Sequence, residues 1–129
     1  MAFRGSKVFV SMTLGDAGVV TALRGRDGRE LWQISEQLAE ATSFNAVAAG
    51  KGIVAAVGQD DKVDGTKTLL GGGFNPETGA ELWLAEAGET GGSGRAGAIT
   101  VGRDAVYVSG RISAPNASTE MTTQAYATQ

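Results

Sequence analysis

The feature that most constrains this chain is a repeated six-residue segment. Residues 27–32 read DGRELW, and residues 78–83, 51 positions further on, read TGAELW. An apolar run precedes each copy, VFVSMT at 8–13 and IVAAVG at 53–58, and a third run, VYVSGRI, occupies 106–112. Repetition at a fixed period indicates a supersecondary unit that is stacked several times, because one unit cannot bury its apolar face alone. We therefore expect a chain built from copies of one unit.

The segments between turn residues are short and rich in β-branched and aromatic side chains, as strands are. Ten strands are expected, at 7–13, 18–24, 30–35, 45–49, 52–58, 67–75, 81–86, 97–102, 105–112 and 122–129. Glycine supplies 20 of the 129 residues. Because glycine adopts positive φ without steric cost in tight hairpins, we interpret the excess as turn residues and not as a phosphate-binding loop.

The period of the repeat predicts the fold class. Spacings of about 40–50 residues are typical of propellers whose blades have four strands. The chain is therefore predicted to be all-β, a partial β-propeller of four-stranded antiparallel blades, with blade portions at about 1–36, 42–87 and 95–129. Residues 1–6 leave little room for an innermost strand, so three, four and three strands are expected. The connection at 35–41 could form a helical turn after a serine cap or a plain loop.

Both copies of the repeat resemble the tryptophan-docking motif of the PQQ-type, or quinoprotein-like, β-propeller repeat. That motif reads roughly A-x-D-x-x-T-G-x-x-x-W, and the matching segments are residues 22–32, ALRGRDGRELW, and 73–83, GFNPETGAELW. The first copy has Arg24 at the aspartate position and Asp27 at the threonine position, and the second has Asn75 for the aspartate. The residues of the blade motif are Ala22, Asp27, Gly28, Trp32, Asn75, Thr78, Gly79 and Trp83.

The residue types of this motif suit structural roles. Asp, Asn and Thr side chains bond turn amides, and glycine takes the left-handed position between the last two strands. Tryptophan is a large, rigid side chain that can fill the wedge between two blades, and its indole N–H seeks an acceptor. We therefore interpret Trp32 and Trp83 as anchors of the fold.

The resemblance also implies that blades are missing. Closed propellers use about 4–8 blades, whereas 129 residues make about two and a half at this period. The third repeat stops with Gln129 at the aspartate position of the motif. We expect a fragment of a longer propeller, with a protomer that completes a ring by self-association as the alternative. The expected partners are the missing blades, further copies that pair through open edges, or other proteins.

Composition excludes several kinds of chemistry. The chain has no cysteine and no histidine, so disulfides, thiolate nucleophiles, Ser-His-Asp triads and ordinary zinc sites are excluded for these residues. A net charge of −3 without a Lys/Arg cluster argues against nucleic-acid binding. No apolar run reaches the roughly 18–20 residues of a membrane helix, and the N-terminus lacks signal-peptide features. The compartment is not given by the residues; the resemblance implies a periplasmic or other extracytoplasmic one.

Two short motifs are assigned structural roles. Residues 92–97, GSGRAG, match GxGxxG, but a strand and not a helix follows, so 88–97 is expected to be a flexible loop between blades. Residues 60–65, DDKVDG, match the start of a calcium loop but carry Lys62 and Gly71 at positions that ligate in an EF-hand. A solvated hairpin is favoured there. No catalytic or metal-ligating residue is assigned, and cofactor-binding residues are left open.

The resemblance implies two functional classes. One comprises non-catalytic propellers that offer loops and edges for protein contacts, such as the bacterial outer-membrane assembly lipoprotein. The other comprises PQQ-dependent alcohol or sugar dehydrogenases, in which the quinone and a calcium ion lie over the central channel. The chain shows no Trp-Asp-Asn-rich quinone floor, so we expect an interaction or scaffold module without a cofactor. The alternative is a dehydrogenase fragment, which would use PQQ and calcium.

Overall fold

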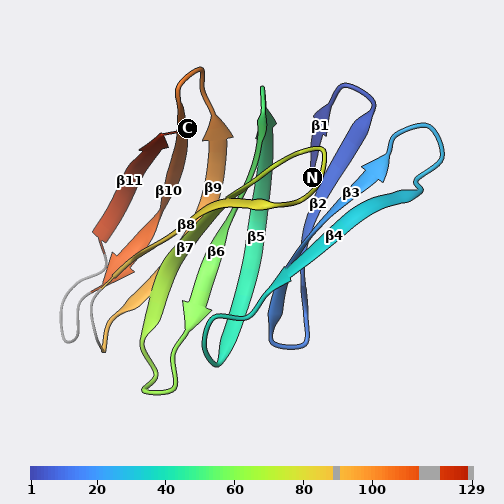
Figure 1. Ribbon diagram of the computed structural model, residues 1–129. Coiled ribbons are helices and arrows are strands. Elements are labelled where there is room, and N and C mark those ends of the chain that lie inside the picture. Colours follow the sequence, from blue (N-terminus) through green and yellow to red (C-terminus); the bar gives the residue numbers. More distant parts are fainter. Residues whose placement is uncertain (89–90, 114–119, 128–129) are drawn as a thin grey trace.

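The computed structural model consists of three antiparallel sheets that lie face to face (Figure 1). It describes residues 1–88, 91–113 and 120–127. Sheet A contains β1 (Ala2–Arg4), β2 (Lys7–Leu14), β3 (Ala17–Arg24) and β4 (Glu30–Glu36). Sheet B contains β5 (Ala41–Gly50), β6 (Ile53–Asp61), β7 (Lys67–Phe74) and β8 (Glu81–Ala87). Sheet C contains β9 (Ser93–Val101), β10 (Ala105–Ser113) and β11 (Glu120–Ala127). Within each sheet, strands that follow one another in sequence pair with one another.

The all-β class and the ten expected strands are confirmed, but the start of the chain differs from the expectation. β1 pairs with β2 across a tight turn in which Gly5 has a φ of +60°. Three residues are enough for this strand because its hairpin partner is adjacent in sequence. Sheet A therefore has four strands, and the described residues form sheets of four, four and three strands. The expected last strand, 122–129, is β11; residues 128–129 lie outside the described residues.

The helical alternative for 35–41 is wrong, because β4 continues to Glu36 and β5 begins at Ala41. The flexible loop expected at 88–97 is also wrong in its second half, since β9 begins at Ser93. A Cβ at Gly94 would lie 2.8 Å from the backbone nitrogen of Leu69. The glycine at this position therefore permits close approach of β9 to β7, and the glycine-rich composition does not here indicate a loop.

Sheet B is buried on both faces, and β6 shows why. Val54 and Ala56 belong to a core cluster shared with sheet A, whereas Ile53, Ala55 and Val57 belong to a second cluster shared with sheet C. Successive side chains of a strand point to opposite faces, so both faces must be apolar. This requirement explains the continuous apolar run in the sequence.

A bulge recurs in sheets B and C at the same place. The register of β5 shifts opposite Gly58, and that of β9 shifts opposite Gly110, 52 residues later. A Cβ at Gly58 would lie 1.9 Å from the carbonyl oxygen of Ser43, and one at Gly110 would lie 2.2 Å from that of Arg95. The bulge is thus part of the repeated unit, and it requires a glycine on the opposite strand, Gly58 or Gly110, because a Cβ there would collide with the backbone.

Candidate functional site

The two motif copies form equivalent turns, at residues 24–29 between β3 and β4 and at 75–80 between β7 and β8. In each turn the amide of the first residue donates to the carbonyl of the sixth at 2.8 Å, and the glycine amide donates to the carbonyl of the first at 2.8 Å. The glycines, Gly28 and Gly79, have φ values of +73° and +78°. The same backbone conformation is therefore repeated, and its fifth position requires the left-handed region.

The polar residues of the motif stabilise the turns, although their identities differ. Asp27 accepts from the backbone N–H of the residue two positions later at 3.1 Å, as the Thr78 hydroxyl does at 3.2 Å. In the second turn Asn75 also accepts from the amide of Glu77 at 2.8 Å. In the first turn Arg24 replaces that residue and forms two hydrogen bonds to Asp27, at 3.0 and 2.6 Å. These bonds hold the pKa of the Asp27 carboxyl below its usual range.

Trp32 joins sheet A to the second turn. Its indole Nε1 donates to the backbone carbonyl of Pro76 at 2.9 Å. The ring lies against Gly79 so closely that a Cβ there would be 2.7 Å from Trp32 Cε3 and 3.1 Å from Ile34. The ring of Phe9 packs against the indole with centroids 6.0 Å apart. The tryptophan of one motif copy therefore contacts the glycine turn of the other copy, in the next sheet.

Trp83 has the same register in sheet B that Trp32 has in sheet A. Trp32 lies opposite the buried Ala22, and Trp83 lies opposite Gly73, with a register shift beside each pair. Trp83 packs against the core cluster between sheets B and C. A Cβ at Gly73 would lie 2.4 Å from its Nε1. The glycine that replaces the motif alanine thus lets the Trp83 indole lie directly over β7.

Charged side chains extend the contact between sheets A and B on either side of Trp32. Lys7 forms an ion pair with Glu77 of the turn at 2.9 Å. Glu36, at the end of β4, faces Glu81 at the start of β8; burial and the neighbouring Glu81 carboxyl raise the pKa of Glu36. The contact therefore contains one attractive and one repulsive charge pair in addition to its apolar centre.

Residues 60–65, which match the start of a calcium loop in sequence, contain the carboxylate of a buried ion pair. Asp60 is fully buried, accepts from the Thr42 hydroxyl at 2.7 Å, and pairs with Lys62 at 2.7 Å. Lys62 also pairs with Glu86 at 2.7 Å. Hydrogen bonds to Asp60 and Glu86 raise the pKa of Lys62. A cavity of about 630 Å³ adjoins Lys62, between the β6–β7 hairpin and the connections on either side.

The other carboxylates of this segment have separate partners. Asp61 pairs with Lys67 at 3.1 Å, and Asp64 accepts from the amide of Thr66 at 2.9 Å. Across residues 1–88, 91–113 and 120–127, no three Asp, Glu, His or Cys side chains form a group that could hold a metal ion. Lys62 occupies the space between the two carboxylates of Asp60 and Glu86.

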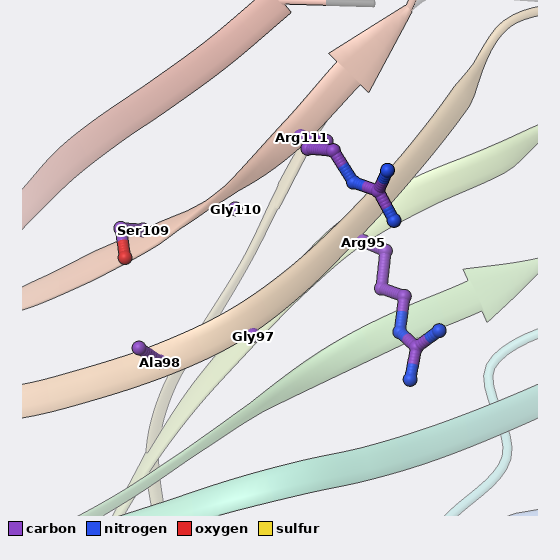
Figure 2. Close-up of a pocket in the computed structure, with 6 residues that line it drawn as sticks. All are labelled: Arg95, Gly97, Ala98, Ser109, Gly110 and Arg111. Atoms are coloured by element: carbon purple, nitrogen blue, oxygen red, sulfur yellow. The ribbon is translucent and has the colours of Figure 1, made fainter.

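The face of sheet C that points away from sheet B has exposed side chains. A hollow of about 460 Å³ lies on this face, and Figure 2 shows the residues of β9 and β10 that line it. The hollow is lined by Arg95, Gly97, Ala98, Ser109, Gly110 and Arg111. A second hollow of about 270 Å³ beside it includes Tyr107, whose exposed fraction is 46%. We call this surface the outer face of sheet C.

The eight motif residues lie in two turns and the strands that flank them, and one tryptophan brings the copies together. The ion pair of Lys7 with Glu77 and the burial of Asp60 were not predicted from the sequence. The spacing of the motif contains no signal for the first pair, because its members are 70 residues apart. A signal for the second was present: Asp60 falls on an apolar strand, and a carboxylate there needs hydrogen-bond partners.

A scan against protein-family models finds no match for this chain, and neither does a search of curated proteins. None of the described residues forms a helix with the length and apolarity that a membrane span requires.

Proposed function

We propose that the three sheets are consecutive blades of a PQQ-like β-propeller and that they act as a non-catalytic scaffold for protein contacts. The observation that carries this proposal is the hydrogen bond from Trp32 to the carbonyl of Pro76, with Gly79 under the indole ring. In this contact a blade motif of one sheet recognises the corresponding turn of the next. Trp32 and Gly79, which the sequence predicts to be structural residues of the motif, thus also join one repeat to the next.

The contact between sheets supports a docking role for the outer face of sheet C. Ala55 in sheet B and Tyr107 in sheet C are equivalent positions of the repeat. Each lies in the second strand of its sheet, and the two residues are 52 positions apart, as are their partners in the first strands, Ala48 and Thr100. Ala55 is fully buried against sheet C, whereas Tyr107 is 46% exposed. A sheet of the same kind would cover Tyr107 as sheet C covers Ala55.

We further propose that this occupant is another sheet of the same repeat. When the chain is alone in solution, the available sheet is sheet A of a second copy. The face of sheet A that points away from sheet B exposes Phe3, 71% accessible, beside its register partner Val8. Because the two open faces differ, the association would be head-to-tail.

Light scattering after size exclusion tests this association. The chain is expected to form species larger than a monomer at concentrations of tens of micromolar. Tyr107→Lys on sheet C and Phe3→Lys on sheet A should each suppress it, because each places a charge in one of the apolar contacts. Val63→Lys serves as the control, since Val63 is 85% exposed on the β6–β7 hairpin, away from both faces.

Mixing the two variants tests the head-to-tail arrangement. Tyr107→Lys retains an intact sheet A face and Phe3→Lys an intact sheet C face, so the mixture should form dimers although neither variant does so alone. A wild-type chain that remains a monomer with a cooperative melt would contradict the proposal. An effect of Tyr107→Lys without any effect of Phe3→Lys would also contradict it, because it would indicate pairing of two sheet C faces.

The non-catalytic assignment has its own test. Spectral titration of the full-length protein with PQQ and calcium should give no saturable binding. A stoichiometric, calcium-dependent quinone complex would overturn the scaffold proposal and support the dehydrogenase alternative.

A further inference from the structure

A polar cavity of about 330 Å³ lies where β9 passes the ends of β6 and β7. It is lined by Gln59, Lys67, Ser93, Arg95, Arg111 and Ser113. Three of the six side chains are cations, and two carry hydroxyl groups. The sequence gives no hint of this cluster, because the three cations come from strands β7, β9 and β10.

Two of the cations are forced together by the register of sheet C. Arg95 of β9 and Arg111 of β10 are direct partners across the pair of strands. Figure 2 shows both side chains extending in the same general direction from their strands. Like charges placed directly opposite one another are unfavourable in a sheet. Among the side chains of residues 1–88 and 91–113, no carboxylate lies within 4.0 Å of either guanidinium.

The third cation, Lys67, has one carboxylate partner. Asp61 lies 3.1 Å from the Lys67 Nζ and also accepts from Gln59 at 2.9 Å. Its charge offsets that of Lys67, whereas the two arginines have no carboxylate partner among the side chains of residues 1–88 and 91–113. The cavity and its rim therefore have a net charge of about +2, with guanidinium and hydroxyl donors around the space.

We propose that this cavity binds a tetrahedral oxyanion of the phosphate type. A guanidinium group presents planar, paired N–H donors that match the oxygen geometry of phosphate, and bonds between two charged groups are the strong ones. Two such groups facing one space would each donate to the anion, whose charge would also relieve the repulsion between them. The hydroxyl of Ser93 in the lining can donate to a further oxygen.

The cavity lies at the rim of the outer face of sheet C. Its position does not conflict with the proposed docking there, because the residue equivalent to Arg111 in sheet B is Gln59. Gln59 remains only half-buried although sheet C covers its sheet. The anion site and the association are therefore separable properties, and each can fail without the other.

Titration with inorganic phosphate at constant ionic strength, followed by calorimetry and by ³¹P NMR, tests the proposal. Saturable binding with one anion per chain is expected. Arg111→Gln and Arg95→Gln should each weaken it about tenfold, since each removes a charge-assisted pair of hydrogen bonds. Arg95→Lys should retain part of the affinity, because it keeps the charge and loses the fork. Arg103→Gln, in the exposed turn between β9 and β10, is the matched control.

A parallel titration with phenyl phosphate distinguishes two sources of the anion. Equal affinity for the ester supports the phosphoryl group of a larger molecule, and much weaker affinity supports free phosphate. Absence of saturable binding to either would overturn the proposal. An equal loss of affinity in Arg103→Gln would also overturn it, because it would show attraction to net charge alone. Circular dichroism establishes that each variant has the wild-type fold.

Discussion

The docking of Trp32 on Gly79 predicts that two chemically identical substitutions in equivalent turns have different effects. Gly28 and Gly79 occupy the same turn position, with φ of +73° and +78°. A Cβ at Gly28 would meet nothing within 4 Å, whereas one at Gly79 would lie 2.7 Å from the Trp32 ring. Alanine at position 28 therefore changes the backbone alone, and alanine at position 79 also disturbs the contact between sheets.

The magnitudes follow from these two terms. Positive φ costs an alanine about 1–2 kcal/mol, and the reduced entropy of the unfolded chain offsets about 0.4–1 kcal/mol of it. Gly28→Ala should thus lower the free energy of unfolding by about 1 kcal/mol. Overpacking against Trp32 adds about 1–3 kcal/mol at position 79, so Gly79→Ala should lower it by about 2–4 kcal/mol.

Urea denaturation followed by far-ultraviolet circular dichroism measures both values. All variants are compared at one protein concentration, since association would shift the apparent stability. In a Trp32→Leu background the effect of Gly79→Ala should fall towards that of Gly28→Ala, because the opposing ring is gone and only the 3.1 Å approach to Ile34 remains. This double-mutant cycle isolates the coupling to Trp32. Equal effects of the two alanines in the wild-type background, or no coupling to Trp32, would refute the docking argument.

Three further outcomes are expected. Lys62→Met should lower the free energy of unfolding by about 3 kcal/mol in urea melts, because it leaves the buried Asp60 with one neutral partner; a neutral effect would argue against that pair. The pKa of Lys62 is raised in the folded state, so the charged lysine contributes its full stabilisation of the fold below the usual lysine pKa of about 10.4. That stabilisation is lost as the pH rises through the folded-state pKa. Melts of wild type between pH 9 and 12 should therefore show a decline in stability that Lys62→Met lacks. Glu36→Gln should raise the free energy of unfolding at pH 7 by about 0.5 kcal/mol, because it removes repulsion from Glu81. Because the pKa of Glu36 is raised in the folded state, the stability of wild type should increase relative to that of the variant as the pH falls. A constant difference in stability from pH 7 to pH 4 would contradict the repulsion between Glu36 and Glu81.

Much of the fold was accessible from the sequence because its signals are local. The period of the motif and the turn residues located ten strands, and the two-sided burial of sheet B is encoded in the apolar run at 53–57. β1 escaped because three residues carry no periodicity. The expected loop at 88–97 was wrong because a glycine such as Gly94 serves close approach as well as turning, and only the neighbouring strand shows which role applies.

The site was accessible only in part. The motif identified Trp32 and Gly79 as members of one pattern, but their contact joins different copies and depends on how the sheets stack. The pairing of Arg95 with Arg111 depends on the bulge opposite Gly110, which sets the register of the strands. The spacing of residues in the sequence gives neither the stacking of the sheets nor the register of the strands. Residues that face one another across sheets or strands are therefore visible only in the structure.

The indole N–H of Trp32 reports directly on the docking of one repeat on the turn of the next. The chain has two tryptophans, so a ¹⁵N-labelled sample and a Trp32→Phe variant assign the two indole signals. The expected result is a Trp32 N–H that exchanges slowly with solvent and shows nuclear Overhauser contacts to residues of the 75–80 turn, with the ring close to the Gly79 Hα protons. Exchange at the rate of a free indole, without contacts to that turn, would show that Trp32 does not dock on the neighbouring repeat.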